Sequence, residues 1–163
     1  MNSTRPLNPG DCNEVLSVYR EAVESGAAVL YSAAQCRAWA AQTISGPSRD
    51  ALTAVLLNGI GLVSCSERGE IEAFAVLHPL DRLALLYCRS GRSRQGRASQ
   101  LLEQLEGEAQ RRGVTELRTE ASFLSRPLLQ RRGWHICWQE ELLIEGQLFR
   151  RFRMAKPLPP ILA

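Results

Sequence analysis

The pattern of apolar and polar positions changes character near residue 60. Before it, apolar residues recur at helical spacing behind capping residues, which predicts helices. After it, the apolar runs become short and are bounded by glycine, proline and other turn residues, which predicts strands. The predicted helices span residues 11–25, 32–41, 51–57, 100–112 and 125–132, and the predicted strands span residues 61–66, 71–77, 83–88, 114–121, 134–144 and 148–154.

The order of these elements constrains the fold. It gives an α/β sheet of mixed direction, with the one long helix packed after the strand of residues 83–88. The length of 163 residues fits one domain. We expect this domain to span residues 1–157, because three prolines at 157, 159 and 160 make residues 158–163 a tail that cannot continue a strand.

The segment between the strand of residues 83–88 and the long helix predicts an anion site. Residues 89–97 contain four arginines and two glycines. Free N–H groups at a helix start, the helix dipole and arginine side chains all favour a phosphate, and small residues at Gly96 and Ala98 allow a bulky ligand close to the backbone. The glycine spacing fits neither the P-loop nor the dinucleotide fingerprint, and a charged helix start is also common in solvated turns.

Gly96, Ala98 and Ser99, with the leucines that follow, resemble the acyl-CoA loop of the GNAT N-acetyltransferases. The signature of that loop is Gln/Arg-x-x-Gly-x-Gly/Ala followed by Ser-x-Leu-Leu, and Ser93 departs from it at the first position. The C-terminal half is similar to one GNAT subgroup through Glu120-Ala121-Ser122, Arg126-Pro127, Gly133-Trp134 and Met154-Ala155-Lys156. The resemblance covers nearly the whole chain. It implies a GNAT-type mixed, mostly antiparallel central sheet of about six to seven strands, with helices on both faces.

The resemblance also implies the chemistry and the cofactor site. An amine attacks the acetyl-CoA thioester directly, so the protein holds two substrates in line and stabilises an oxyanion. A gap between the strands of residues 83–88 and 114–121 would hold the pantetheine against strand backbone, and the loop would hold the pyrophosphate. The implied cofactor-binding residues are Leu86, Tyr87, Cys88, Ser93, Arg94, Gln95, Gly96, Arg97, Ala98, Ser99 and Ser122.

The side chains that usually assist this reaction are replaced here. Leu129 stands where the family often has a tyrosine that protonates the departing thiolate. Arg82 and Ala84 stand where the family often has an acidic residue or a histidine that relays the proton of the amine. The replacement candidates are Glu120, His78 and Tyr31, while Tyr31 and Trp39 are candidate walls of an acceptor pocket. Each has a structural alternative: Glu120 as a helix cap, His78 as a solvated strand end, and the aromatic pair as core.

Composition narrows the classes of protein. A hydrophobic fraction of 45% argues against disorder, and a net charge of +3 is too small to indicate nucleic-acid binding. Lys156 is the one lysine among 20 basic residues, which a coding bias explains best. Five cysteines without a CxxC pair, and two histidines, give no zinc spacing. We therefore expect no metal and free thiols in a cytoplasmic protein without a membrane span, with Cys88 as a minor nucleophile candidate.

The sequence thus predicts an acyltransferase that moves an acetyl group from acetyl-CoA to the primary amine of a small molecule or peptide. We expect a monomer or homodimer without nucleic-acid or membrane partners. One alternative is a CoA-binding sensor or interaction subunit with weakened catalysis, which Leu129 and Ala84 favour. Another is an RNA-binding domain that uses Arg89, Arg92, Arg94 and Arg97, but the segment lacks interleaved aromatic residues.

Overall fold

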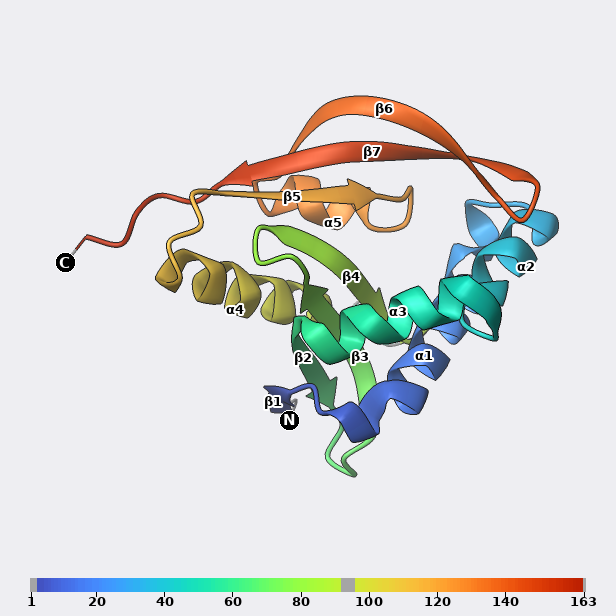
Figure 1. Ribbon diagram of the computed structural model, residues 1–163, viewed down its shortest axis with the longest axis horizontal. Coiled ribbons are helices and arrows are strands. Elements are labelled where there is room, and N and C mark those ends of the chain that lie inside the picture. Colours follow the sequence, from blue (N-terminus) through green and yellow to red (C-terminus); the bar gives the residue numbers. More distant parts are fainter. Residues whose placement is uncertain (1–2, 92–95, 163) are drawn as a thin grey trace.

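The computed structural model describes residues 3–91 and 96–162 and contains one seven-stranded sheet within those ranges (Figure 1). The strands are β1 (Ser3–Pro6), β2 (Ile60–Cys65), β3 (Ile71–Leu77), β4 (Arg82–Cys88), β5 (Glu116–Ala121), β6 (His135–Ile144) and β7 (Gln147–Pro157). Their order across the sheet is β1-β2-β3-β4-β5-β7-β6. Neighbours are antiparallel except β4 and β5, which are parallel. The predicted mixed, mostly antiparallel sheet is confirmed.

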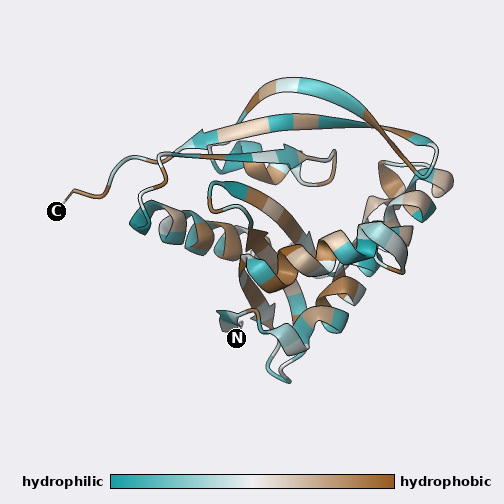
Figure 2. Ribbon diagram, in the orientation of Figure 1, coloured by the Kyte–Doolittle hydropathy of each residue, from teal (hydrophilic) through white to brown (hydrophobic). Residues whose placement is uncertain are grey.

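Helices cover both faces of this sheet. They are α1 (Cys12–Glu21), α2 (Ala33–Ala41), α3 (Gly46–Asn58), α4 (Arg97–Arg111) and α5 (Arg126–Arg131). α1 continues into a π-helical segment at Ala22–Gly26 and a 3-10 helix at Ala27–Val29. Apolar residues of α1, α2 and α3 belong to one core cluster, and those of α4 and α5 belong to a second. Figure 2 shows apolar residues concentrated on the central strands and more polar residues on β6 and β7.

β3 shows why the sequence forms a layered core. Every residue of Ile71–Leu77 is buried, and all but Glu72 are apolar, so the strand reads as a nearly continuous apolar run rather than an alternating one. Phe74 and Val76 lie in the cluster with α1, α2 and α3, whereas Ala75 and Leu77 lie in the cluster with α4. The strand is therefore covered on both faces.

Helix boundaries follow local capping chemistry where the sequence provides it. Ser32 begins α2, as predicted. Its hydroxyl accepts a 3.1 Å hydrogen bond from the Gln35 backbone N–H, and the Gln35 side chain accepts a 2.9 Å bond from the Ser32 N–H. α3 begins earlier than predicted, at Gly46, with a proline in its first turn.

The two ends of the chain differ from the sequence prediction. β1 was not predicted, because four mostly polar residues carry no strand pattern; it pairs with β2, and Arg5 binds the Asp11 carboxylate at 2.7 and 3.0 Å. At the other end β7 reaches Pro157, and Leu158 of the predicted tail is buried. The Leu158 N–H donates a 2.8 Å hydrogen bond to the Thr115 carbonyl, so this residue packs with the domain.

β4 and β5 pair over only two residues before they separate. Arg82 lies opposite Arg118 and Leu83 lies opposite Thr119. Immediately beyond, the pairing of β4 with β3 shifts register, and Ala84 is the extra residue of this bulge. Because a bulge bends its strand, β4 turns away from β5 and leaves an open edge along residues 84–88, which we call the β4–β5 gap.

No helix in these ranges is long and apolar enough to cross a bilayer. Nor do the described His, Cys, Asp and Glu side chains form any group of three or more that could hold a metal ion.

Candidate active site

A cavity of about 680 Å³, here called the larger cavity, opens between the end of β4, the start of α4 and α5. Its walls consist mainly of small or apolar residues, which leave backbone close to the open space. The lining residues are Ala22, Gly26, Leu86, Tyr87, Cys88, Ser90, Gly96, Ala98, Ser99, Leu124, Ser125, Pro127, Leu128 and Arg131. The predicted cofactor residues Leu86, Tyr87, Cys88, Gly96, Ala98 and Ser99 are all among them.

The start of α4 forms part of the wall of this cavity. Gly96 precedes the helix with φ of +75°, a left-handed conformation that favours glycine, and a Cβ built on it would meet nothing within 4 Å. Among the described residues no side chain caps the helix start, and the first turn carries no acidic residue. Ala98 and Ser99 of this first turn lie in the cavity wall, and the N–H groups of a first helical turn suit an anion.

Two of the four loop arginines, Arg89 and Arg97, lie among the described residues. Ser93, Arg94, Gln95 and Arg92 lie outside the described residues. Arg97 has only 4% of its surface exposed, and its guanidinium donates to Ser64 Oγ at 3.0 Å and to the Cys65 carbonyl at 3.3 Å. These bonds direct the Arg97 side chain to β2, so a phosphate at the loop would meet the backbone of Arg97 rather than this guanidinium.

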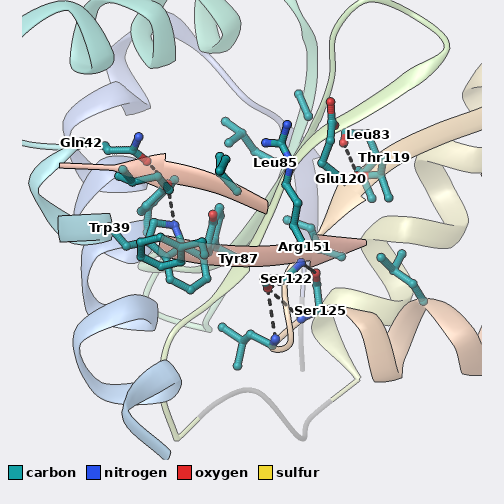
Figure 3. A pocket seen from close by; sticks show the side chains of 18 of the residues that line it. Trp39, Gln42, Leu83, Leu85, Tyr87, Thr119, Glu120, Ser122, Ser125 and Arg151 are labelled. Carbon is teal, nitrogen blue, oxygen red and sulfur yellow. Dashed lines mark hydrogen bonds between the residues drawn. The ribbon is translucent and has the colours of Figure 1, made fainter. Parts of the chain in front are cut away.

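A smaller cavity of about 280 Å³ lies at the β4–β5 gap, with residues of both strands in its wall (Figure 3). It shares Leu86, Tyr87, Leu124 and Ser125 with the larger cavity, so the two spaces meet along β4. The remaining walls come from α1, α2, β4, β5, α5 and the β6–β7 hairpin. A ligand that extended through the larger cavity along β4 would thus reach a second compartment.

Tyr31 and Trp39, the predicted walls of an acceptor pocket, both line the smaller cavity. Both are also buried in an aromatic cluster, with ring centroids 5.2 Å apart in an edge-on arrangement. Each residue is therefore part of the core and part of the cavity wall. The Tyr31 hydroxyl accepts a 2.8 Å hydrogen bond from the Phe123 N–H, and burial raises the pKa of this tyrosine. That hydroxyl positions the loop between β5 and α5.

Tyr19 and Tyr87 add a second aromatic contact that the sequence analysis did not identify. Their ring centroids lie 4.0 Å apart, and Trp39 Nε1 donates a 2.9 Å hydrogen bond to the Tyr19 hydroxyl. Burial raises the pKa of both tyrosines, so both are neutral phenols in the wall of the smaller cavity.

The other two candidate proton carriers, Glu120 and His78, differ in their placement. Glu120 lines the smaller cavity, but Oε2 accepts a 3.0 Å hydrogen bond from Arg82 and Oε1 accepts a 3.0 Å bond from Arg153. It is therefore an ion-paired carboxylate rather than the helix cap that was the alternative. His78 lines neither cavity; its backbone N–H and C=O bond to Arg82.

The loop after β5 lies at the junction of the two cavities. Ser122 lines the smaller cavity, and its hydroxyl accepts hydrogen bonds from the N–H groups of Leu124 at 3.1 Å and Ser125 at 3.2 Å. Leu124 and Ser125, which line both cavities, were missed by sequence reasoning, although the serines of Ser122-Phe123-Leu124-Ser125 are a turn signal. Leu129 is 1% exposed and also lines the smaller cavity.

Cys88 lines the larger cavity at the end of β4. Burial raises the pKa of its thiol to about 11, although the nearby Arg97 opposes this shift. The thiol is therefore protonated near neutral pH and is a poor nucleophile.

No protein-family model and no curated protein sequence matches this chain. Solved structures match it over almost its whole length. A GCN5-related N-acetyltransferase from Rhodopseudomonas palustris aligns with a TM-score of 0.86 and 24% identity, over 97% of this chain and 96% of its own. The PaiA N-acetyltransferase of Thermoplasma acidophilum, solved with coenzyme A, gives a TM-score of 0.73 and 17% identity, over 96% and 99%. YncA of Salmonella typhimurium, solved with acetyl-CoA, gives a TM-score of 0.69 and 20% identity, over 100% and 97%. The chain therefore has the fold of the GNAT N-acetyltransferases.

Proposed function

We propose that this protein transfers an acetyl group from acetyl-CoA to a primary amine by direct attack in a ternary complex. The observation that carries the proposal is the meeting of two cavities along the open edge of β4. The larger one contains the start of α4, a helix N-terminus of the kind that suits a pyrophosphate, and the smaller one has room for a second, small substrate. Solved proteins of this fold include complexes with coenzyme A and acetyl-CoA.

The backbone of the chain performs most of the work in this proposal. Residues 86–88 lie beyond the part of β4 that pairs with β5, so their backbone edge can pair with the amides of pantetheine as with an added strand. The N–H groups at the start of α4 bind phosphate oxygens, and Gly96 lets the ligand approach. A backbone N–H on the open edge of β4 is suited to the thioester oxygen where the cavities meet.

Proton transfer does not depend on a free side-chain acid or base in this proposal. Leu129 supplies no proton to the departing thiolate, but a thiol with a pKa of about 8.5 is a tolerable leaving group without one. Both oxygens of Glu120 already accept hydrogen bonds, and the Tyr31 hydroxyl is engaged by Phe123. We therefore propose that Glu120 orients the amine and that solvent in the open cavity accepts the proton that the amine loses.

The alternative is a protein that binds CoA as a sensor and has lost transfer. Leu129 in the cavity wall, without an acidic side chain at that position, is the observation that favours it. General acid–base assistance is worth about 10²–10⁴-fold, so its loss slows the reaction without abolishing it.

Two measurements separate these functions. Acetyl-CoA and CoA should raise the melting temperature far more than pantetheine does, because pantetheine lacks the pyrophosphate. At a ligand concentration near 100 Kd the stabilisation should be about 2.7 kcal/mol. A panel of amines is then incubated with acetyl-CoA, and release of free thiol is followed. Release of thiol identifies a transferase, and binding of acetyl-CoA without thiol release identifies a sensor. Equal shifts of the melting temperature with CoA and pantetheine would contradict the proposed pyrophosphate site.

RNA binding through the loop finds little support. Arg89 binds Glu21 at 2.5 Å and donates to the Ile71 carbonyl, and Arg97 is buried, so two of the four arginines are engaged inside the protein.

A further inference from the structure

The walls of the smaller cavity carry an excess of positive charge. Among the described residues that line it, Arg82, Arg150 and Arg151 are cationic, and Glu120 is the one carboxylate. The cavity wall therefore has an excess of two positive charges. Arg150 is exposed, and Glu141 lies opposite it on β6 but does not line this cavity.

Two of these arginines belong to a ladder of ion pairs that links β4, β5, β6 and β7. Glu120 pairs with Arg82 and Arg153, and Glu140 pairs with Arg151 and Arg153. The ladder contains three guanidinium groups and two carboxylates, so one positive charge is unbalanced within it. Its members hold one another in place, which fixes the direction of the arginine side chains.

Arg151 is the member of the ladder with donors to spare. Its Nε donates a 3.0 Å hydrogen bond to Glu140 Oε1, whereas neither terminal nitrogen bonds to any described residue. The side chain is 30% exposed and lies among the residues that line the smaller cavity in Figure 3. Two parallel N–H donors on a rigid guanidinium match the two oxygens of a carboxylate.

We propose that the acceptor is an amino acid whose carboxylate is bound by Arg151, an assignment that rests on the proposed acetyl transfer. A small amine that also carries a carboxylate brings the negative charge that the cavity wall lacks. A purely cationic amine, such as a polyamine or a lysine side chain, would add positive charge to a wall that already has an excess. Glu120 lies in the same wall and suits the ammonium end of a zwitterion. The volume of about 280 Å³ fits a molecule of this size.

The test compares each amino acid with its own amide, which keeps the amine and side chain but replaces the carboxylate by a neutral group. Thiol release at saturating acetyl-CoA gives kcat/KM for both. The parent protein should prefer the acid by about 10- to 100-fold, as expected for a hydrogen-bonded charge pair. Arg151→Gln should lower kcat/KM for the acid by a similar factor and change the rate with the amide less than threefold.

Arg118→Gln is the matched control, because Arg118 is also an ion-paired strand arginine but lines neither cavity. It should leave the preference for the acid intact. Equal rates with acids and amides, or an equal loss on both in Arg151→Gln, would overturn the carboxylate assignment while acetyl transfer stands. If acetyl-CoA binds but no amine releases thiol, transfer itself fails. Titration of amino acids and their amides into CoA-loaded protein then tests whether Arg151 binds the carboxylate. Equal affinities for acid and amide, or no binding of either, would overturn that assignment.

Discussion

Thr119 on β5 donates a 2.7 Å hydrogen bond from its hydroxyl to the carbonyl of Leu83 on β4. These two residues form the last pair that joins the strands, and both are buried. The bulge at Ala84 follows directly. The bond therefore fixes the point from which β4 and β5 separate, and with it the position of the β4–β5 gap.

Thr119→Val should test this relationship. Valine keeps the shape of threonine but removes the donor, so the buried Leu83 carbonyl loses a partner. We expect the free energy of unfolding to fall by about 1–2 kcal/mol in urea titrations, with an unchanged m-value, and acetyl-CoA binding to weaken. The exposed Thr115 gives a matched control, since Thr115→Val should stay within about 0.5 kcal/mol of the parent. A Thr119→Val protein as stable as the parent would contradict this role.

Gly96→Val should abolish acetyl-CoA binding and leave the fold intact. The new side chain meets no protein atom, but it occupies space that the ligand needs in the larger cavity. The left-handed backbone, with φ of +75°, adds a strain of about 1–2 kcal/mol. The measurement is the rise in melting temperature caused by acetyl-CoA.

Gly69→Val controls for the strain in that experiment. Gly69 has φ of +82°, an added Cβ there also meets nothing within 4 Å, and it lines neither cavity. Both variants should lose similar stability, whereas only Gly96→Val should lose the ligand-induced shift. Retention of the shift in Gly96→Val would show that the loop is misassigned.

The backbone part of this site was predictable from the sequence because its requirements appear as residue types. Gly96 and Ala98 stand between an apolar strand and an amphipathic helix, and a loop that must approach a ligand closely needs small residues at such positions. The seven strands were likewise predictable except β1, whose pairing with β2 depends on tertiary contacts rather than on its own pattern.

The side-chain part was not predictable because it depends on which distant segments meet. Arg82, Glu120 and Arg151 come from three strands that are separated by tens of residues, and no local spacing indicates that they form one wall. The direction of Arg97 was hidden for the same reason. Its position in an arginine-rich loop indicated phosphate binding, whereas Ser64 and the β2 backbone hold its guanidinium inside the protein.

Cys88→Ser should retain acetyl transfer, because the Cys88 thiol is protonated in the working pH range. With a pKa raised by burial to about 11, about one thiol in a thousand is ionised at pH 8. Alkylation of Cys88 by iodoacetamide should therefore rise about tenfold per pH unit from pH 8 towards pH 11. The exposed Cys137 gives an internal comparison by peptide mass analysis. Rapid labelling of Cys88 at pH 7, or loss of acetyl transfer in Cys88→Ser, would contradict this prediction and favour a role for Cys88 as a nucleophile.

Leu129→Tyr should raise kcat if the protein is a transferase whose thiolate leaves without help. Leu129 lines the smaller cavity, so a hydroxyl added there can supply a proton near the departing sulfur, with a gain of up to about 10²-fold. The side chain is 1% exposed, and the larger ring should lower stability by about 1–3 kcal/mol. Leu129→Phe supplies the same ring without the hydroxyl, so a gain in kcat confined to Leu129→Tyr assigns the effect to the proton donor. Equal rates in the two variants, both folded and both binding acetyl-CoA, would mean that protonation of the thiolate does not limit the reaction.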